Sequence, residues 1–145
     1  MELGEFTLRL GASMLAGLAI GFERQWHYKS AGLRTNTLVS VGAAVYVLLS
    51  IQWLQGGTGD ITRVLGQVVT GIGFLGAGII FKEGFAVRGL TTAATVWCSA
   101  AVGCLMAAGF FMQGLVATLF ILGINALLLL VDNWLSNHTK KSKDV

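Results

Sequence analysis

A long run without charged side chains constrains this chain most strongly. None of the residues from 89 to 131 is Asp, Glu, Lys or Arg. As one α-helix this run would be about 65 Å long, roughly twice the ~30 Å thickness of the hydrocarbon core of a bilayer. Two membrane crossings joined by a turn fit the run. A soluble domain of 145 residues with 54% hydrophobic side chains could not bury so much apolar surface.

Three further apolar segments precede this run, so the sequence predicts an all-α, polytopic membrane protein built as a bundle of five transmembrane helices. One transmembrane domain is expected over residues 1–135, with a flexible external loop at residues 55–60 and a short basic cytoplasmic tail at residues 136–145. The chain lacks the basic start of a cleavable signal, so the first apolar segment is expected to stay in the mature protein. The helices are expected at about residues 6–22, 35–53, 64–81, 89–108 and 115–131.

The distribution of Lys and Arg predicts the orientation, because short cytoplasmic loops carry an excess of basic residues. Arg9 and Arg63 would lie on the side of the N-terminus, which is therefore expected outside, with the C-terminus in the cytoplasm. The net charge of +3 is spread over loop ends, so we expect the lipid bilayer, and no nucleic acid, as a partner. The basic residues on the cytoplasmic side would be Arg24, Lys29, Arg34, Lys82, Arg88, Lys140, Lys141 and Lys143.

Small residues recur at close spacing in the first and third predicted helices. Glycine lowers helix stability by about 1 kcal/mol relative to alanine, but in lipid it lets two helix backbones approach. Gly71 to Gly76 also fits the dinucleotide pattern G-x-G-x-x-G, yet no separate strand precedes it and no acidic residue follows about 20 residues later. Packing within the bundle, against a partner or in a homo-oligomer is therefore favoured. The predicted packing residues are Ser13, Gly17, Gly21, Gly71, Gly73, Gly76 and Gly78.

Polar residues gather at three helix ends that the topology places together on the cytoplasmic side. These are residues 23–25, 34–36 and 82–88. We expect Glu23 and Glu83 to form ion pairs with Arg34 and Arg88 there. Two interpretations stay open: interfacial anchors that fix the bundle, or a ligand or ion site.

No motif for catalysis, metal binding or cofactor binding is present. The sequence has no Ser/His/Asp set, no H-E-x-x-H motif and no phosphate-binding loop, and Cys98 has no histidine nearby. We therefore predict no enzyme, no cofactor and no metal centre. The alternative function is a cation channel or carrier, since Glu23 and Glu83 supply carboxylates of the kind that bind Mg²⁺. Asn125, inside the fifth predicted helix, is expected to hydrogen-bond across helices.

Four segments read GFERQW at residues 21–26, AGLRTNTLV at 31–39, VTGIGFLGAGII at 69–80 and VRGLTTAATVWC at 87–98. Together they resemble the MgtC/SapB family of bacterial inner-membrane proteins. The resemblance implies a five-helix regulatory protein of the inner membrane. It implies action through membrane partners, ATP synthase among them, on membrane potential and ATP level. It also implies a link to growth under magnesium limitation, to intramacrophage survival and to virulence.

The resemblance also implies functional residues. Glu83 and Cys98 match two such positions of the family, and Thr91 falls at a third, where the family pattern has Asn. Many relatives continue into a soluble C-terminal domain, so a chain ending at Val145 is either a natural short form or a truncated one. The remaining candidates within the shared segments are Asn36, Glu23, Arg34 and Arg88.

Overall fold

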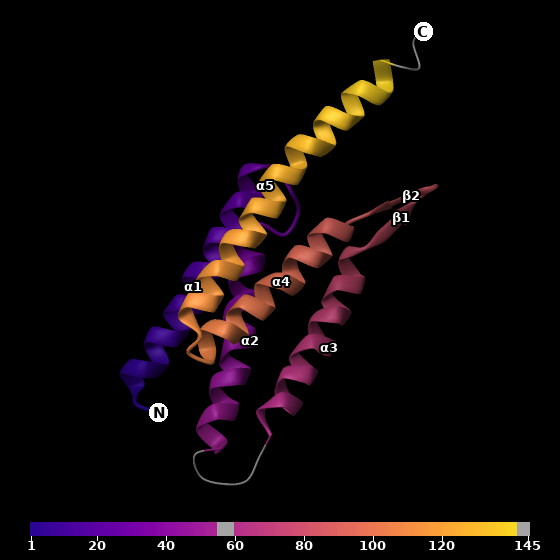
Figure 1. Cartoon of the computed structure of the whole chain (residues 1–145). Coiled ribbons are helices and arrows are strands. Elements are labelled where there is room, and N and C mark those ends of the chain that lie inside the picture. Colours follow the sequence, from indigo (N-terminus) through magenta and orange to yellow (C-terminus); the bar gives the residue numbers. More distant parts are fainter. Residues whose placement is uncertain (55–59, 142–145) are drawn as a thin grey trace.

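The chain forms five α-helices and one short β-hairpin in the computed structural model, which describes residues 1–54 and 60–141 (Figure 1). Each of the five helices is long and apolar enough to cross a membrane. This architecture confirms the predicted all-α, five-helix membrane bundle. In chain order the elements are α1 (Leu3–Trp26), α2 (Leu33–Leu54), α3 (Ile61–Ile79), β1 (Phe81–Glu83), β2 (Ala86–Arg88), α4 (Leu90–Ala107) and α5 (Phe111–Lys141).

The last helix extends well beyond the predicted crossing. Its apolar span ends at Asp132, but α5 continues to Lys141, so most of the predicted basic tail is helical. The end of that tail, residues 142–145, lies outside the described residues, as do residues 55–59 of the predicted loop. The α1–α2 connection, the hairpin and the C-terminal half of α5 share one end of the molecule (Figure 1).

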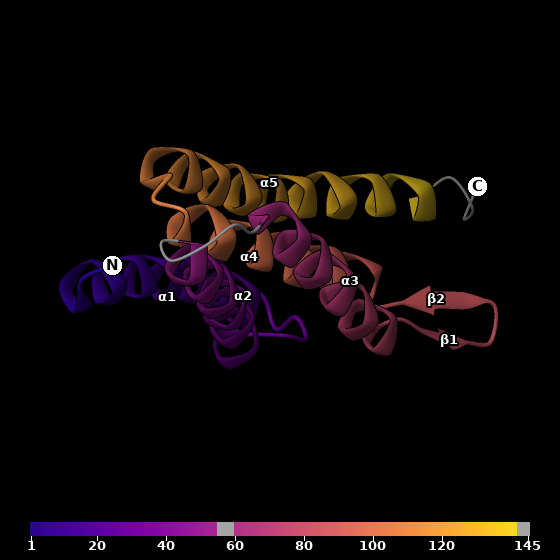
Figure 2. The ribbon, with the colours of Figure 1, turned by 90° about the horizontal axis from the view of Figure 1, so that it is seen from below.

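The β-hairpin between α3 and α4 was not expected from the sequence. The third helix ends at Ile79 rather than at Phe81, and β1 pairs antiparallel with β2. Two-residue hairpin turns favour glycine with a positive φ, and Gly84, which precedes Phe85 in the turn, has φ +62°. All strand residues are exposed, and the hairpin extends away from the helices (Figure 2). It therefore adds an exposed projection to the bundle.

Three helices, α1, α2 and α4, form what we call the packed core. At its centre, a Cβ added at Gly103 of α4 would come within 2.2 Å of the carbonyl oxygen of Ser40 in α2. A Cβ at Gly17 of α1 would lie 2.8 Å from the Cβ of Ser40. The Ser40 hydroxyl donates to the carbonyl oxygen of Ser13 at 2.8 Å. Such close approach is available only to small residues. The packed core therefore holds α4 against α1 and α2, and α3 packs mainly on α4.

Candidate functional site

A buried hydrogen-bond network ties the α1–α2 loop to α4. Asn36, at the start of α2, is fully buried. Its amide nitrogen donates to the carbonyl oxygens of Ala31 and, at 3.1 Å, of Gly32. Its amide oxygen accepts a bond from the Ser99 hydroxyl at 2.8 Å. Ala31 has φ +56°, an uncommon conformation for a residue other than glycine. Asn36 therefore holds the loop in a shape that its own backbone does not favour.

Arg24, near the end of α1, is a buried cation with few partners. Only 3% of its surface is exposed. Its Nη2 donates to the Thr92 hydroxyl at 2.6 Å and to the carbonyl oxygen of Ser30 at 3.4 Å. Its Nε has no hydrogen-bond partner, and it forms no ion pair with any carboxylate of the described residues. The hydrogen bonds of the guanidinium therefore go to neutral groups, although the adjacent carboxylate of Glu23 attracts its charge.

In the sequence, Arg24 stands out only as one member of a polar stretch. Its spacing along α1 held more information, because it follows Gly17 and Gly21 at intervals that keep one face of a helix. In the structure that face is the buried one, and all three residues lie on it. The spacing was the signal that could have identified the buried charge.

A cavity of about 610 Å³ lies beside Arg24, where α1 ends and α4 begins, and we call it the polar cavity. Arg24 and Lys29 come from α1 and the residues after it, and the first turn of α4 forms another wall. The outer wall is α5, which contributes both apolar side chains and Asp132. The lining residues are Arg24, Lys29, Val87, Arg88, Gly89, Leu90, Thr91, Thr92, Ile124, Asn125, Leu128, Leu129 and Asp132.

Asn125 of α5 forms the expected hydrogen bond across helices. Its amide oxygen accepts from the Thr95 hydroxyl of α4 at 3.4 Å, which confirms that prediction. Its amide nitrogen is also buried, yet it has no partner within the described part of the chain. A buried donor without an acceptor is unfavourable by about 1–3 kcal/mol. Asn125 therefore places an unused donor at the polar cavity.

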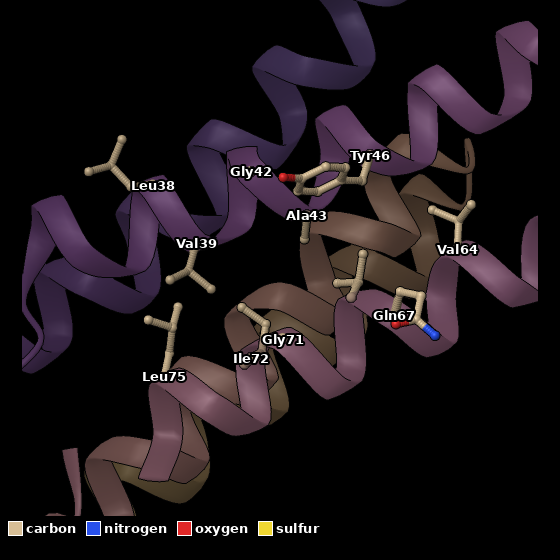
Figure 3. Close-up of a pocket in the computed structure, with 11 residues that line it drawn as sticks. Leu38, Val39, Gly42, Ala43, Tyr46, Val64, Gln67, Gly71, Ile72 and Leu75 are labelled. Atoms are coloured by element: carbon tan, nitrogen blue, oxygen red, sulfur yellow. The ribbon is translucent and has the colours of Figure 1, made fainter. Parts of the chain in front are cut away.

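A second feature is an apolar groove of about 500 Å³ between α2 and α3, which we call the α2–α3 groove (Figure 3). Gly42 on α2 and Gly71 on α3 face open space, since an added Cβ would meet nothing within 4 Å. Gln67 of α3 is an exposed amide on its wall, and it makes no hydrogen bond to residues 1–54 or 60–141. The lining residues are Leu38, Val39, Gly42, Ala43, Tyr46, Val64, Gln67, Val68, Gly71, Ile72 and Leu75.

The model of the MgtC family matches residues 10–134, which is most of the chain. The chain belongs to the MgtC family. It is 64% identical over 118 residues to the Protein MgtC of Brucella abortus, covering 81% of this chain and 48% of that protein. It is 53% identical over 128 residues to the Protein MgtC of Salmonella typhimurium, covering 88% of this chain and 54% of that protein.

An uncharacterized protein of Synechocystis is 43% identical over 145 residues, covering all of this chain and 61% of that protein. The chain thus spans about half the length of the named MgtC relatives it matches. No solved structure matches the chain. Family membership and the five apolar helices together make it a multi-pass membrane protein.

The charged family positions do not gather as the topology suggested. Glu23 contacts His27, the residue that follows α1, at 3.0 Å, and does not pair with Arg34, which is exposed at the start of α2. Glu83 pairs with Arg88 across the hairpin at 2.8 Å, with about two thirds of each side chain exposed. The hairpin carries Glu83 away from the helix ends. Glu23 and Glu83 thus each contact a nearby residue, and the two carboxylates do not form one site.

Three other family positions lie in different surroundings. Thr91 lines the polar cavity, in the first turn of α4. Cys98 lines an apolar pocket of about 580 Å³ between α2, α3 and α4 and carries a free thiol. Asn36 belongs to the buried network described above. The structure thus distributes the family residues over the bundle rather than bringing them into one site.

The predicted packing residues divide into two groups. Gly17 and Gly21 of α1 meet the backbone of the second helix and its preceding loop, at 2.9 Å from Thr37 and 2.7 Å from Leu33 for an added Cβ. Gly76 of α3 faces Ala93 at 3.7 Å. An added Cβ would meet nothing within 4 Å at the other α3 positions, so their packing role stays a prediction that needs a partner. Those positions are Gly71, Gly73 and Gly78.

Proposed function

We propose that this chain is a regulatory protein of the bacterial inner membrane that binds a transmembrane helix of a partner protein in the α2–α3 groove. The N-terminus would lie outside and the C-terminus in the cytoplasm, as the basic residues indicate. The observation that carries the proposal is the groove itself, which combines glycine on both walls with an unpaired amide. Within the described bundle, no other helix packs against these glycines, and no group forms a hydrogen bond with the amide.

Gln67 favours a protein helix over lipid as the occupant. The 19 residues of α3 extend over about 28 Å, close to the thickness of the hydrocarbon core, and Gln67 lies about 9 Å from the start of the helix. An exposed amide at that depth is unfavourable unless it finds a partner. An acyl chain offers no hydrogen bond, whereas a backbone or side-chain group of a second helix does.

The open glycines set the distance at which that helix can pack. Association in lipid depends on van der Waals contact and interhelical hydrogen bonds, and both need close approach. Gly42 and Gly71 allow a backbone to come near the groove floor, whereas leucine at either position would fill it. A partner with small residues on one face therefore fits the α2–α3 groove.

The family resemblance supplies the physiological part of the proposal. ATP synthase is the suspected partner, and the expected consequence of binding is a change in membrane potential and ATP level. Growth under magnesium limitation, intramacrophage survival and virulence would then depend on this regulation. The competing function, cation transport, finds little support, because Glu83 pairs with Arg88 on the exposed hairpin and Glu23 contacts His27 through one carboxylate oxygen. Among the described residues no group of three or more His, Cys, Asp or Glu side chains is placed to hold a metal ion.

Replacement of Gly71 by leucine tests the proposal in cells. The natural protein and the Gly71→Leu variant are produced at equal membrane levels in a strain without its own copy. We expect Gly71→Leu to lose growth at low magnesium and to lose the effect on cellular ATP. Gly123→Leu is the matched control, since Gly123 of α5 also has nothing within 4 Å of an added Cβ but lies outside the groove. Equal growth of both variants would contradict the proposal.

A flux assay separates regulation from transport. Purified natural protein in liposomes is expected to give no protein-dependent Mg²⁺, K⁺ or proton flux. A flux that disappears in Glu83→Gln would instead establish the channel or carrier.

A further inference from the structure

We propose that the polar cavity binds a phosphate group, carried either by an anionic lipid or by a soluble phosphate. The proposal concerns a different surface from the α2–α3 groove and does not depend on the partner bound there. It starts from the buried Arg24, whose charge meets no ion-pairing carboxylate in the described chain. The adjacent carboxylate of Glu23 attracts the guanidinium charge but contacts His27 through Oε1 at 3.0 Å, and its buried Oε2 has no hydrogen-bond partner in the described chain.

A buried guanidinium needs an anion or a full set of acceptors, because removal of a charge from water is unfavourable by several kcal/mol. Arg24 has the Thr92 hydroxyl and a distant carbonyl oxygen on one nitrogen, while its Nε has no acceptor. The cavity beside it is roomy enough for a small ligand, at about 610 Å³. An oxyanion in the cavity would satisfy both the charge and the unused donor.

The start of α4 adds backbone donors to the same wall. The first N–H groups of a helix lack partners inside the helix and carry a partial positive charge. Gly89 precedes α4 with φ +88° and provides no side-chain cap. Thr91 and Thr92 of the first turn line the cavity. This arrangement is suited to phosphate oxygens.

Asn125 supplies an independent observation from the opposite wall. Its buried amide nitrogen donates to no described group, although its oxygen accepts from Thr95. Arg24 and Asn125 thus present unused donors to one cavity from two different helices. A ligand that only accepts hydrogen bonds fits both, and a cation does not.

The mouth of the cavity has a positive balance. Lys29 and Arg88 line it together with Arg24, and Asp132 is the acid among the lining residues. Arg88 is partly neutralised by Glu83 on the hairpin. The α5 wall includes Ile124 and Leu128, each more than half exposed on the surface that faces lipid. A phospholipid could place its phosphate at Arg24 and an acyl chain along that wall, whereas free phosphate would use only the polar part.

Thermal unfolding of the purified natural protein in phosphate-free neutral detergent tests the site. Tryptophan fluorescence reports the unfolding temperature. The probes are inorganic phosphate, short-chain phosphatidylglycerol and, as a zwitterionic control, short-chain phosphatidylcholine, with sodium chloride at matched ionic strength. We expect inorganic phosphate or phosphatidylglycerol to raise the unfolding temperature in a saturable way, because a ligand of the folded state stabilises it. A rise with phosphatidylglycerol alone would identify a lipid as the source of the phosphate group, and a rise with inorganic phosphate alone would identify a soluble phosphate.

Two variants test the location. Asn125→Asp places a carboxylate in the cavity, and we expect it to raise the half-saturating concentration at least tenfold. Lys29→Gln removes one charge at the mouth and should raise it about two- to fivefold, whereas Lys82→Gln, on the hairpin outside the lining, should leave it unchanged. The proposal is overturned if neither probe shifts the natural protein beyond the salt control. It is also overturned if Asn125→Asp responds like the natural protein.

Discussion

Glycine meets opposite surroundings in the packed core and in α3. In the packed core an added Cβ at Gly103 would come within 2.2 Å of a backbone oxygen of α2. In α3 an added Cβ at Gly71, Gly73 or Gly78 would meet nothing within 4 Å. The same contrast holds for whole spans, since 56% of the α4 span is buried but only 11% of the α3 span. Small residues therefore close the bundle in one region and leave an open helix face in the other.

The contrast explains why a glycine pattern does not by itself identify an interface. Both regions carry small residues at helix-packing spacing, and both cross the membrane by length and composition. What differs is whether another helix of the same chain lies opposite. The open face of α3 is where the proposed partner helix would bind, and substitutions should separate the two regions.

The largest effect is expected from Gly103→Leu. Its side chain would collide with the main chain of Ser40, which cannot move without displacing α2 from α1 and α4. Overpacking of this kind is unfavourable by about 1–3 kcal/mol, and by more where the backbone must shift. We expect loss of the monodisperse protein in detergent, measured by size-exclusion chromatography and thermal unfolding. Gly73→Leu is the control and should be as stable as the natural protein. Equal stability of the two variants would show that Gly103 is no more tightly packed than Gly73.

Asn36→Leu should have the second largest effect. It removes the bonds to two loop carbonyl oxygens and to the Ser99 hydroxyl, and leaves buried polar groups unpaired. The free energy of unfolding should fall by about 2–3 kcal/mol. Arg34→Gln, at an exposed position nearby, should change it by less than about 0.5 kcal/mol. Similar unfolding curves for the two variants would show that the network does not hold the loop.

Glu83→Gln should affect stability little, because its ion pair with Arg88 lies on the exposed hairpin. Exposed pairs contribute about 0–1 kcal/mol. Thermal unfolding of Glu83→Gln in detergent should therefore match the natural protein within about 1 kcal/mol. A larger loss would place Glu83 in the structural framework of the bundle and not on a free projection.

The smallest effect is expected at the start of α3. The Thr62 hydroxyl and then its backbone N–H donate to Asp60 and hold the pKa of that carboxyl below its ordinary value of 3.8. Because the folded-state pKa is lowered, the stabilisation is present above pH 3.8 and is lost as the pH falls below it. Hydrogen exchange at the first turn of α3 should therefore speed up in acid. Asp60→Ala should show the faster exchange already at neutral pH, and an unchanged rate would contradict the cap.

Hydropathy predicted the five helices because each crossing needs a long apolar run, and that signal is strong. It placed the end of α3 at Phe81 because Phe81 is as apolar as the helix before it, although the chain has already turned into the hairpin. The ion pair of Glu83 with Arg88 was predicted correctly. The expected pair of Glu23 with Arg34 was not, because His27 lies four residues from Glu23 and contacts it instead. Gln67 and Asn125 are both amides within apolar helices, and only the arrangement of the helices shows that Asn125 meets Thr95 while Gln67 is exposed.

Photo-crosslinking in native membranes tests directly whether a partner helix binds in the α2–α3 groove. A photoreactive amino acid replaces Leu75, which lines the α2–α3 groove, or Leu119 of α5, which is exposed outside it. We expect an adduct with a membrane subunit of ATP synthase from Leu75, its loss when Gly71→Leu is added, and none from Leu119. An adduct with a second copy of the chain would make the groove a self-association surface. Equal adducts from both positions, or none from Leu75, would show that the groove does not bind this partner.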